Sequence, residues 1–240
     1  MRAFLKLLLI GAVLIGLLIP IFLLKGLVYE RQERGREVAE EIARASSRAQ
    51  DLVGPLLVVS WEETLRRERR VRQNGKEEEV RQELTRVRVR RLFAPETLEI
   101  DNRLSTRERH RGLFGALVYT DQLGMKARFA LPDLPPVEGE RIASRWLSAA
   151  LVLGVGDARG IQRIGVRVDG NEQRVEPGST LGFVAEGVNV PVSTAGWISG
   201  GALALELDAQ LQGTQSLQWS PLAGEARVSV EADWPHPSFQ

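Results

Sequence analysis

An unbroken apolar run near the N-terminus constrains this chain more than any other feature. Residues 7–24, from Leu7 to Leu24, carry no charge, and Lys6 and Lys25 flank them. An α-helix rises about 1.5 Å per residue, so the run spans about 27 Å, close to the roughly 30 Å hydrocarbon core of a bilayer. Lysines at such positions extend their methylene stems and place their charges among the headgroups. The run therefore predicts a membrane-inserted helix, with the lipid bilayer as its partner.

The length of this run distinguishes a permanent anchor from a cleaved signal peptide. A secretory signal has an apolar stretch of about 7–15 residues followed by a small-x-small cleavage site. Here the apolar stretch is longer, and residues 23–30 contain no such site. We expect residues 1–29 to form an uncleaved transmembrane anchor, with a cleaved signal as the alternative.

Charge gives a weak indication of which side of the membrane carries the rest of the chain. Positive residues favour the cytoplasm, and Lys25 with the arginines that follow it outnumber Arg2 and Lys6. That count leans toward a cytoplasmic body. However, long domains cross membranes largely regardless of loop charge. The chain has no cysteine, so disulfides give no indication of the compartment.

A polar helical segment follows the anchor. Val38, Ile42, Ala45 and Ala49 recur at helical spacing, and the other faces carry Glu and Arg at offsets of three or four. This pattern predicts a helical stalk over residues 30–51 with one narrow packed stripe. A helix that docks on a partner or on lipid headgroups is the alternative.

Beyond the stalk, the pattern changes to strand alternation, in a domain predicted over residues 52–240. Val87, Val89 and Phe93 alternate with arginines, which places one face of a strand against a core and the other in water. We interpret the arginine row at 86, 88 and 90 as a solvated face, with an anionic-lipid or nucleic-acid patch as the alternative. The formal net charge of +1 lacks the basic excess of a nucleic-acid binder, so no nucleic-acid partner is expected.

Turn signals divide this domain into short strands. Asn74-Gly75 and Asp169-Gly170-Asn171 predict hairpin turns, and a Gln-Leu-Gly turn is expected at residues 122–124. The proline-rich residues 132–140 predict a loop or an internal domain boundary. Short strands with Gly, Pro and Asn punctuation predict a mainly β fold: an antiparallel sandwich or barrel-like domain after the transmembrane helix and stalk.

Three apolar patterns locate further strands. Residues 147–155 form a continuous apolar run and predict a buried central strand. Residues 202–211 alternate leucines with polar side chains, and Val228 and Val230 alternate in the same way near the end of the chain. These patterns predict strands with one face in a core.

The sequence contains no recognisable reaction centre. It has two histidines, His110 and His236, and it lacks a phosphate-binding loop and a nucleophile elbow. Without cysteine or a ligand-spaced cluster, no metal site is indicated. We expect a protein that is not an enzyme and that needs no cofactor.

One glycine-rich segment is the main candidate site. Residues 154–160 superficially resemble a dinucleotide-binding loop, but the third glycine is one residue late and no helical pattern follows. We interpret Asp157 and Arg159 as an ion pair that clamps a glycine-kinked turn. The alternative is a binding role, in which Arg159 contacts the carboxylate of a ligand.

The C-terminal residues form a second unusual segment. Residues 234–239, Trp-Pro-His-Pro-Ser-Phe, combine aromatic rings with prolines, which end a strand because proline cannot donate to a sheet ladder. We expect a loop that packs Trp234 and Phe239 against the body.

These two segments resemble the signature stretches of the CreD family of bacterial inner-membrane proteins. The stretches that resemble the family signatures are residues 155–161 and 234–239. Weaker similarities occur in the same order and at similar spacing over essentially all of the chain. They are found at residues 52–56, 93–98, 109–114 with Tyr119, and 176–178.

The resemblance implies a protein of the bacterial inner membrane with one N-terminal anchor and a large periplasmic β-rich domain. It implies a role in envelope integrity or stress response, through contacts with lipids or other envelope proteins. The alternative is a periplasmic sensor or small-anion-binding domain. Family members continue into further transmembrane helices, so a chain that stops at Gln240 is either a fragment or a shortened relative. The residues that the resemblance marks as structural or binding candidates are Gly156, Asp157, Arg159, Gly160, Trp234, Pro235, His236 and Pro237.

Overall fold

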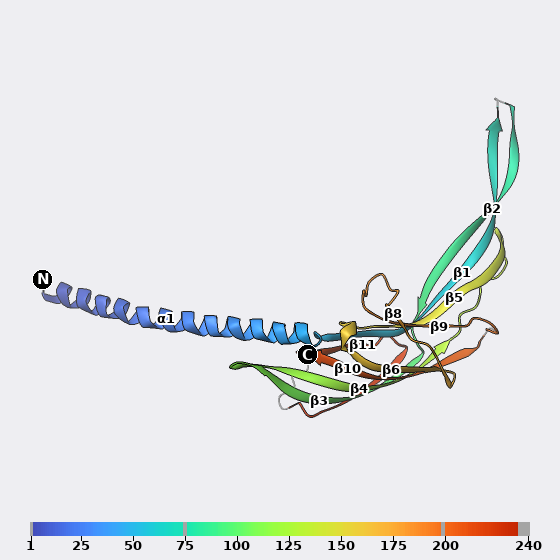
Figure 1. Cartoon of the computed structure of the whole chain (residues 1–240). Helices are drawn as coiled ribbons and strands as arrows, with labels where there is room; N and C mark the ends of the chain where they lie inside the picture. Colours follow the sequence, from blue (N-terminus) through green and yellow to red (C-terminus); the bar gives the residue numbers. More distant parts are fainter. Residues whose placement is uncertain (1, 74–75, 198–199, 235–240) are drawn as a thin grey trace.

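A long N-terminal helix and a β-rich body make up the computed structural model, which describes residues 2–73, 76–197 and 200–234. Side chains at 2–3, 5, 7–10, 12–15, 19, 69–73 and 76–81 are outside the description. The helix α1 (Arg2–Ala45) is continuous for 44 residues and projects from one end of the body (Figure 1). It ends at Ala45, before the predicted end of the stalk, because Ser47 and Gln50 bond to other parts of the body.

The predicted membrane anchor lies on α1, and most of its side chains fall outside the described residues. In the part of the chain that is described, no helix combines the length and the apolar character that a membrane span requires. The apolar side chains that are described near the end of the predicted anchor, including Leu24, Val28 and Tyr29, are exposed.

The body consists of strands joined mainly by short connections. Two of these strands, β1 and β2, are unusually long. In chain order the elements are β1 (Gln50–Gln73), β2 (Lys76–Phe93), β3 (Thr97–Arg111), β4 (Phe114–Ala130), β5 (Arg141–Gly154), the 3-10 turn η1 (Ala158–Gly160), β6 (Ile161–Val168), β7 (Asn171–Glu172), β8 (Glu176–Pro177), β9 (Gly187–Val192), β10 (Ala202–Thr214), β11 (Leu217–Ser220) and β12 (Glu225–Ala232).

These strands form two sheets, and the predicted mainly β fold is confirmed. One sheet has the order β11-β1-β5-β9-β8, with β2 also paired to β1, and the other has the order β12-β3-β4-β10-β6-β7. Most pairs are antiparallel, but β11 runs parallel to β1 and β12 parallel to β3. The sequence did not indicate these parallel edges, because alternation predicts a strand without giving the direction of its partner.

The hydrophobic core lies between the two sheets. Leu98 and Ile100 on β3 point inward, and β10 alternates buried and exposed residues as predicted for residues 202–211. Trp146 contacts Trp61 at 6.1 Å and Trp197 at 5.5 Å between ring centroids. The proline-rich residues 132–140 link β4 of one sheet to β5 of the other.

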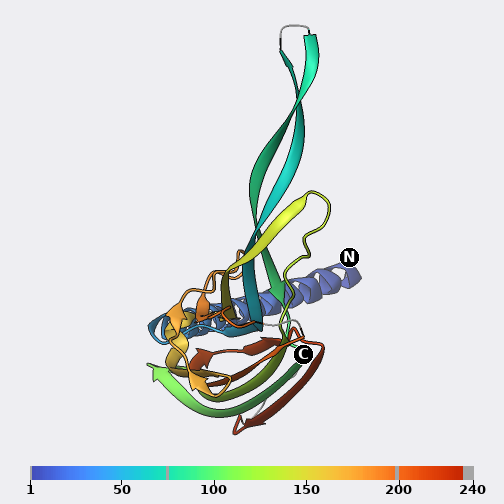
Figure 2. The same cartoon turned by 90° about the vertical axis from the view of Figure 1, so that its right-hand side faces the viewer.

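The hairpin of β1 and β2 extends beyond the body as an arm (Figures 1 and 2). The third strand of this region, β5, pairs with β1 only as far as Leu65, so the distal arm has two strands. On β2, Val87 and Val89 are half-buried and Arg88 is exposed, which confirms the predicted alternation. The predicted Asn74-Gly75 turn lies outside the described residues. The predicted turn at Asp169-Gly170 is confirmed, since both residues have positive φ between β6 and β7.

The turn predicted at residues 122–124 is wrong. The strand β4 runs through this segment without interruption. Its neighbours explain why: Gly124 is paired with Asp101 on β3 and with Asp208 on β10. Ladder hydrogen bonds on both sides hold the glycine in extended backbone, so a local turn preference does not decide its conformation.

Two predicted apolar strands are less buried than their patterns indicated. Within residues 147–155, Leu147 is 37% exposed and burial begins at Ala149, because a register shift between β1 and β5 lies at this point. Val228 and Val230 are 40% and 49% exposed, since β12 is an edge strand of its sheet. An alternating pattern identifies a strand but does not tell whether a second layer covers it.

On β4, the buried carboxylate of Asp121 has no hydrogen bond in the described residues to offset the cost of its burial. Asp121 is 0% exposed, faces the core between Leu104 and Leu211 on the neighbouring strands, and in the described part of the chain neither of its oxygens has a hydrogen-bond partner. Burial raises the pKa of Asp121 to about 7. On the same sheet face, the Oδ1 of the buried Asn102 is also unpaired.

Asp121 should make stability fall as pH rises. Because its pKa is raised from 3.8 to about 7 on folding, the native state holds the proton more tightly between these values. Stability is then full below about pH 4 and decreases by up to about 4 kcal/mol above pH 7. We expect Asp121→Asn to flatten this dependence and to raise stability at pH 8, in urea unfolding of the detergent-solubilised chain.

The control is Asp101→Asn, on the exposed face of the same sheet. Equal pH profiles of stability for the Asp121→Asn and unsubstituted chains would contradict the assignment.

Candidate functional site

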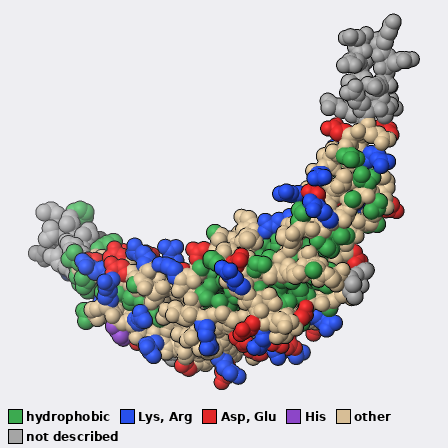
Figure 3. All heavy atoms as spheres, turned by 45° about the vertical axis from the view of Figure 1, so that its right-hand side comes forward, with side chains coloured by type: hydrophobic (Ala, Val, Ile, Leu, Met, Phe, Trp, Pro, Cys, Tyr) green, Lys and Arg blue, Asp and Glu red, His purple; other side chains and the backbone are tan. Residues whose placement is uncertain are grey.

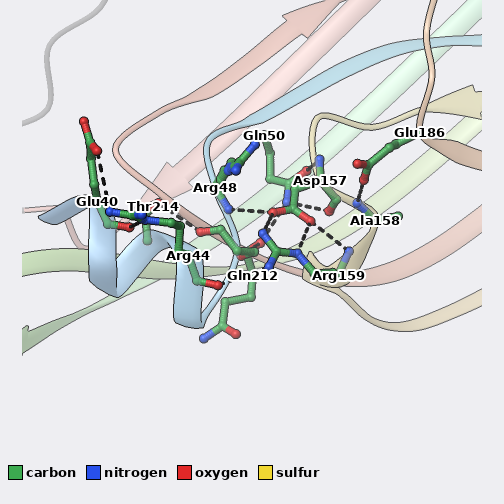
Figure 4. A network of polar contacts seen from close by, with 11 residues as sticks. Glu40, Arg44, Arg48, Gln50, Asp157, Ala158, Arg159, Glu186, Gln212 and Thr214 are labelled. Atoms are coloured by element: carbon green, nitrogen blue, oxygen red, sulfur yellow. Dashed lines mark hydrogen bonds and ion pairs between the residues drawn. The ribbon is translucent and has the colours of Figure 1, made fainter.

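The candidate segment around Asp157 lies where α1 meets the body. Four parts of the chain converge there: the last turn of α1 with the linker after it, the start of β1, the η1 turn and the end of β10 (Figure 4). The sequence brings η1 to this place because it directly follows β5, the central partner of β1.

Asp157 is the centre of this junction. It is 3% exposed, and its two oxygens accept four hydrogen bonds. Oδ1 accepts from the backbone N–H of Arg159 at 3.1 Å and from its Nε at 3.0 Å, while Oδ2 accepts from its Nη2 at 2.7 Å and from the N–H of Arg48 at 3.0 Å. The predicted ion pair is therefore confirmed, and Asp157 also caps the N-terminus of η1.

Arg159 connects this carboxylate to the helix. Its Nη1 donates to the backbone carbonyl of Arg44 at 3.1 Å, which satisfies one of the carbonyls that a helix C-terminus leaves free. The side chain is 55% exposed, so the pair is half-buried. Nε, Nη1 and Nη2 each already donate to a protein oxygen. This arrangement favours the structural interpretation of Arg159 over the capture of a ligand carboxylate.

Gln50 provides the second set of bonds, and sequence reasoning missed it. It is 1% exposed, and its Nε2 donates to the carbonyls of Asp157 at 3.1 Å and Gln212 at 3.0 Å. Its Oε1 accepts from the N–H of Asp157 at 3.3 Å. A single glutamine in the predicted stalk gave no signal of this role, because its partners lie more than a hundred residues away in the sequence.

Gly156 and Gly160 are required because the chain segments approach closely. A Cβ at Gly156 would lie 2.7 Å from the carbonyl oxygen of Ala49 and 2.8 Å from the backbone nitrogen of Asp51. A Cβ at Gly160 would collide with the carbonyl of Gln212 and the side chain of Gln50. Close packing of the chain segments therefore explains why glycine occupies these two positions.

A second group of hydrogen bonds joins the linker after α1, residues 46–49, to the end of β10. The Oγ of Ser47 donates to the carbonyl of Gln212 at 2.5 Å, and the hydroxyl of Thr214 donates to the carbonyl of Ser47 at 2.9 Å. The N–H of Ala158 donates to the Glu186 carboxylate at 2.6 Å. The junction is thus bonded from both sheets.

The C-terminal candidate residues begin beside this junction. Trp234 is half-buried and lies 5.9 Å from the ring of Tyr119, whose hydroxyl donates to the carbonyl of Ser216 at 2.8 Å. Burial raises the pKa of the Tyr119 hydroxyl, so it remains a donor at neutral pH. The contact agrees with the expectation that Trp234 packs on the body. Pro235, His236, Pro237 and Phe239 lie outside the described residues.

The pKa of Asp157 is that of a carboxylate whose charge is fully compensated by its partners. The Arg159 guanidinium holds the pKa of Asp157 at about 2, well below its usual 3.8. Asp157 is therefore ionised at neutral pH and carries no proton that it could donate there. Among the residues that the structure describes, no group of three or more potential metal-ligating side chains occurs. His110 lies at the surface, 3.5 Å from Glu108.

Comparison with known proteins gives a clear family match. The sequence matches the CreD family, described as "Inner membrane protein CreD", over residues 2–240. Inner membrane protein CreD of Escherichia coli (strain K12) is 31% identical over 232 residues, which make up 96% of this chain and 49% of that protein. The chain therefore spans about half the length of this relative. No solved structure matches the chain.

Removing the central carboxylate should destabilise the fold. Asp157→Ala leaves the N–H groups of Arg48 and Arg159 and a half-buried guanidinium without their acceptor, which should lower the free energy of unfolding by about 2–3 kcal/mol. Urea unfolding of the detergent-solubilised chain measures this. The matched control is Glu206→Ala, which breaks an exposed pair with Arg167 and should cost less than about 1 kcal/mol. Equal losses in the two variants would contradict the structural assignment.

The same pair also predicts a pH dependence at acid pH. The pKa of Asp157 falls from 3.8 to about 2 on folding, so the unfolded chain takes up the proton first. The stabilisation is full above about pH 4 and is lost as pH falls toward 2, by about 2 kcal/mol in total. Asp157→Ala should lack this component in unfolding measurements below pH 4.

Proposed function

We propose that this chain, which belongs to the CreD family of inner membrane proteins, is a membrane-anchored envelope protein with its β-rich body in the periplasm. In this proposal α1 anchors the chain through residues 7–24, and the body supports envelope integrity through contacts with lipids or other envelope proteins. The family match supports the membrane location. The apolar run supports the anchor, since its length suits a bilayer core.

The observation that carries this proposal is the fixed connection between α1 and the body. The Asp157–Arg159 pair binds the end of the helix, and Arg111 pairs with Glu41 on the helix one turn earlier. A flexible tether would let the body rotate freely above a membrane. A clamped helix instead fixes the orientation of the body relative to the helix axis, which suits a protein that presents particular surfaces at particular heights.

The arm is the surface that we expect to meet a partner. It leaves the body at the end opposite to α1, so an anchored chain holds it away from the bilayer (Figure 1). At about 3.3 Å per residue, the 24 residues of β1 measure about 80 Å. The base of the arm exposes the arginines at 86, 88 and 90, whereas acidic and basic side chains are interspersed over the body (Figure 3).

Small-anion binding is the second candidate, and one observation favours it. A shallow hollow of about 380 Å³ on the outer face at the base of the arm is lined by Arg86, Arg145, Glu62 and small neighbours. Arg145 already bonds Glu62 at 3.0 Å, so among the described residues that line the hollow Arg86 is the guanidinium left to attract an anion. This makes the hollow a weaker basis for function than the anchored arm.

Membrane anchoring and orientation can be tested together. The chain should stay in the membrane fraction after carbonate and high-salt washes, and its mass should include residues 1–26. A reporter that is active only in the cytoplasm, fused after Gln240, should be silent, whereas a periplasmic reporter should be active. Loss of the N-terminal residues from the mature chain would refute the anchor, and a bright cytoplasmic reporter would reverse the orientation.

The role of the arm can be separated from folding. Residues 67–83 lie beyond the last pairing with β5, so replacing them with Asn-Gly should close a hairpin between Arg66 and Leu84 and leave the core intact. We expect cooperative unfolding to persist while cells that depend on the protein become sensitive to detergent or dye. Leu57→Ala is the folding control, with a loss of about 2–5 kcal/mol. Full protection by the arm-deleted chain would contradict the proposal.

A further inference from the structure

The hairpin that joins β3 and β4 ends in an exposed apolar residue. Arg111 pairs with Phe114, so the turn consists of Gly112 and Leu113. Gly112 has φ of 65°, which only glycine adopts readily, and Leu113 is 90% exposed. Turns of this length usually carry Gly, Asn, Asp or Ser. A bare leucine at the tip is therefore not explained by the turn itself.

The same tip is held beside α1. A Cβ on Gly35 of the helix would lie 3.5 Å from the ring of Phe114. The guanidinium of Arg111 pairs with Glu41, and the Nη1 of Arg109 donates to Ser46 at 3.2 Å. In Figure 1 the hairpin runs under the helix and points to the same side as the N-terminus. Leu113 thus has a fixed height along α1.

That height lies near the expected surface of the bilayer. Gly35 follows Tyr29, the last residue of the predicted anchor, by six residues, or about 9 Å of helix. The headgroup layer on each side of a bilayer is about 5–8 Å thick. Transmembrane helices tilt by about 20° on average, which lowers one side of the protein toward the headgroups. The tip therefore lies within reach of the outer headgroups.

The charges behind the tip suit an anionic surface. Arg107, Arg109 and Arg111 alternate along β3 and so share one face of the hairpin. Among the described residues, Arg111 pairs with Glu41 and Arg109 donates one N–H to the hydroxyl of Ser46, so the charges of Arg107 and Arg109 have no acidic partner there and can attract phosphate groups. Electrostatic attraction extends over about 8–10 Å at physiological salt, so these guanidinium groups need not touch the lipid to contribute.

We infer that the β3–β4 tip is a second membrane contact, in which Leu113 enters the headgroup region of the leaflet from which α1 emerges and the arginines behind it face anionic lipid phosphates. This inference rests on the proposed anchoring of α1. Two contacts on one membrane fix the tilt of the body, which one helix alone leaves free.

The absence of cysteine from the chain permits a direct test. Single variants Leu113→Cys, Val28→Cys and Val137→Cys carry an environment-sensitive fluorophore, and the full chain is reconstituted in vesicles of phosphatidylethanolamine and phosphatidylglycerol. Lipids with a quencher on the headgroup report contact. Val28 on α1 reports the anchor, Leu113 reports the tip, and Val137, 65% exposed in the loop between β4 and β5, is the aqueous control.

The expected result is strong quenching at position 28, intermediate quenching at 113 and little at 137. Quenching at 113 should fall at least twofold when phosphatidylcholine replaces the anionic lipid, while position 28 stays unchanged. If 28 is quenched and 113 behaves like 137, the second contact is refuted and the anchor stands. If 28 is not quenched, the anchoring itself fails. Quenching at 113 that does not depend on anionic lipid would refute the role of the arginines.

Discussion

The buried carboxylate of Asp157 is the interaction on which the architecture depends. Its oxygens accept from Arg159 and from the linker that follows α1, and Arg159 in turn binds the last turn of the helix. A buried charge persists only when its hydrogen-bonding capacity is filled. Filling it here requires the helix end, the linker and the η1 turn to be in place together. The carboxylate thus links the position of the helix to the correct formation of the sheets.

This link gives the molecule two distinct ends. The helix and the β3–β4 hairpin point to one side, and the β1–β2 arm extends at the other (Figure 1). Because β1 both receives the chain from the helix and forms half of the arm, a single strand joins the two ends. The body between them has a continuous core built from both sheets. After the short linker at residues 46–49, the path from the helix to the arm therefore runs through packed strands.

Sequence reasoning predicted the features that depend on local pattern. Alternation identified β2 and β10, and the Asp-Gly pair identified the turn after β6. The Asp157–Arg159 pair was predictable because its members are two residues apart beside glycines. Features set by distant partners were not predictable. The strand β4 continues through Gly124 because two neighbours hold it, and Gln50 matters because Asp157 before η1 and Gln212 on β10 converge on its carboxamide. None of these partners leaves a mark near the residue in the sequence.

Asp157 and Asp121 show how partners, and not burial alone, decide the state of a carboxylate. Both side chains are almost fully buried, yet the pKa of Asp157 is about 2 and that of Asp121 about 7. Arg159 and two backbone N–H groups compensate the first, whereas the second faces leucines on both neighbouring strands. At neutral pH one of these groups holds the helix in place and the other weakens the core. The end of the body that meets α1 is therefore secured by a charge that does not titrate at physiological pH, and the interior of the body contains one that does.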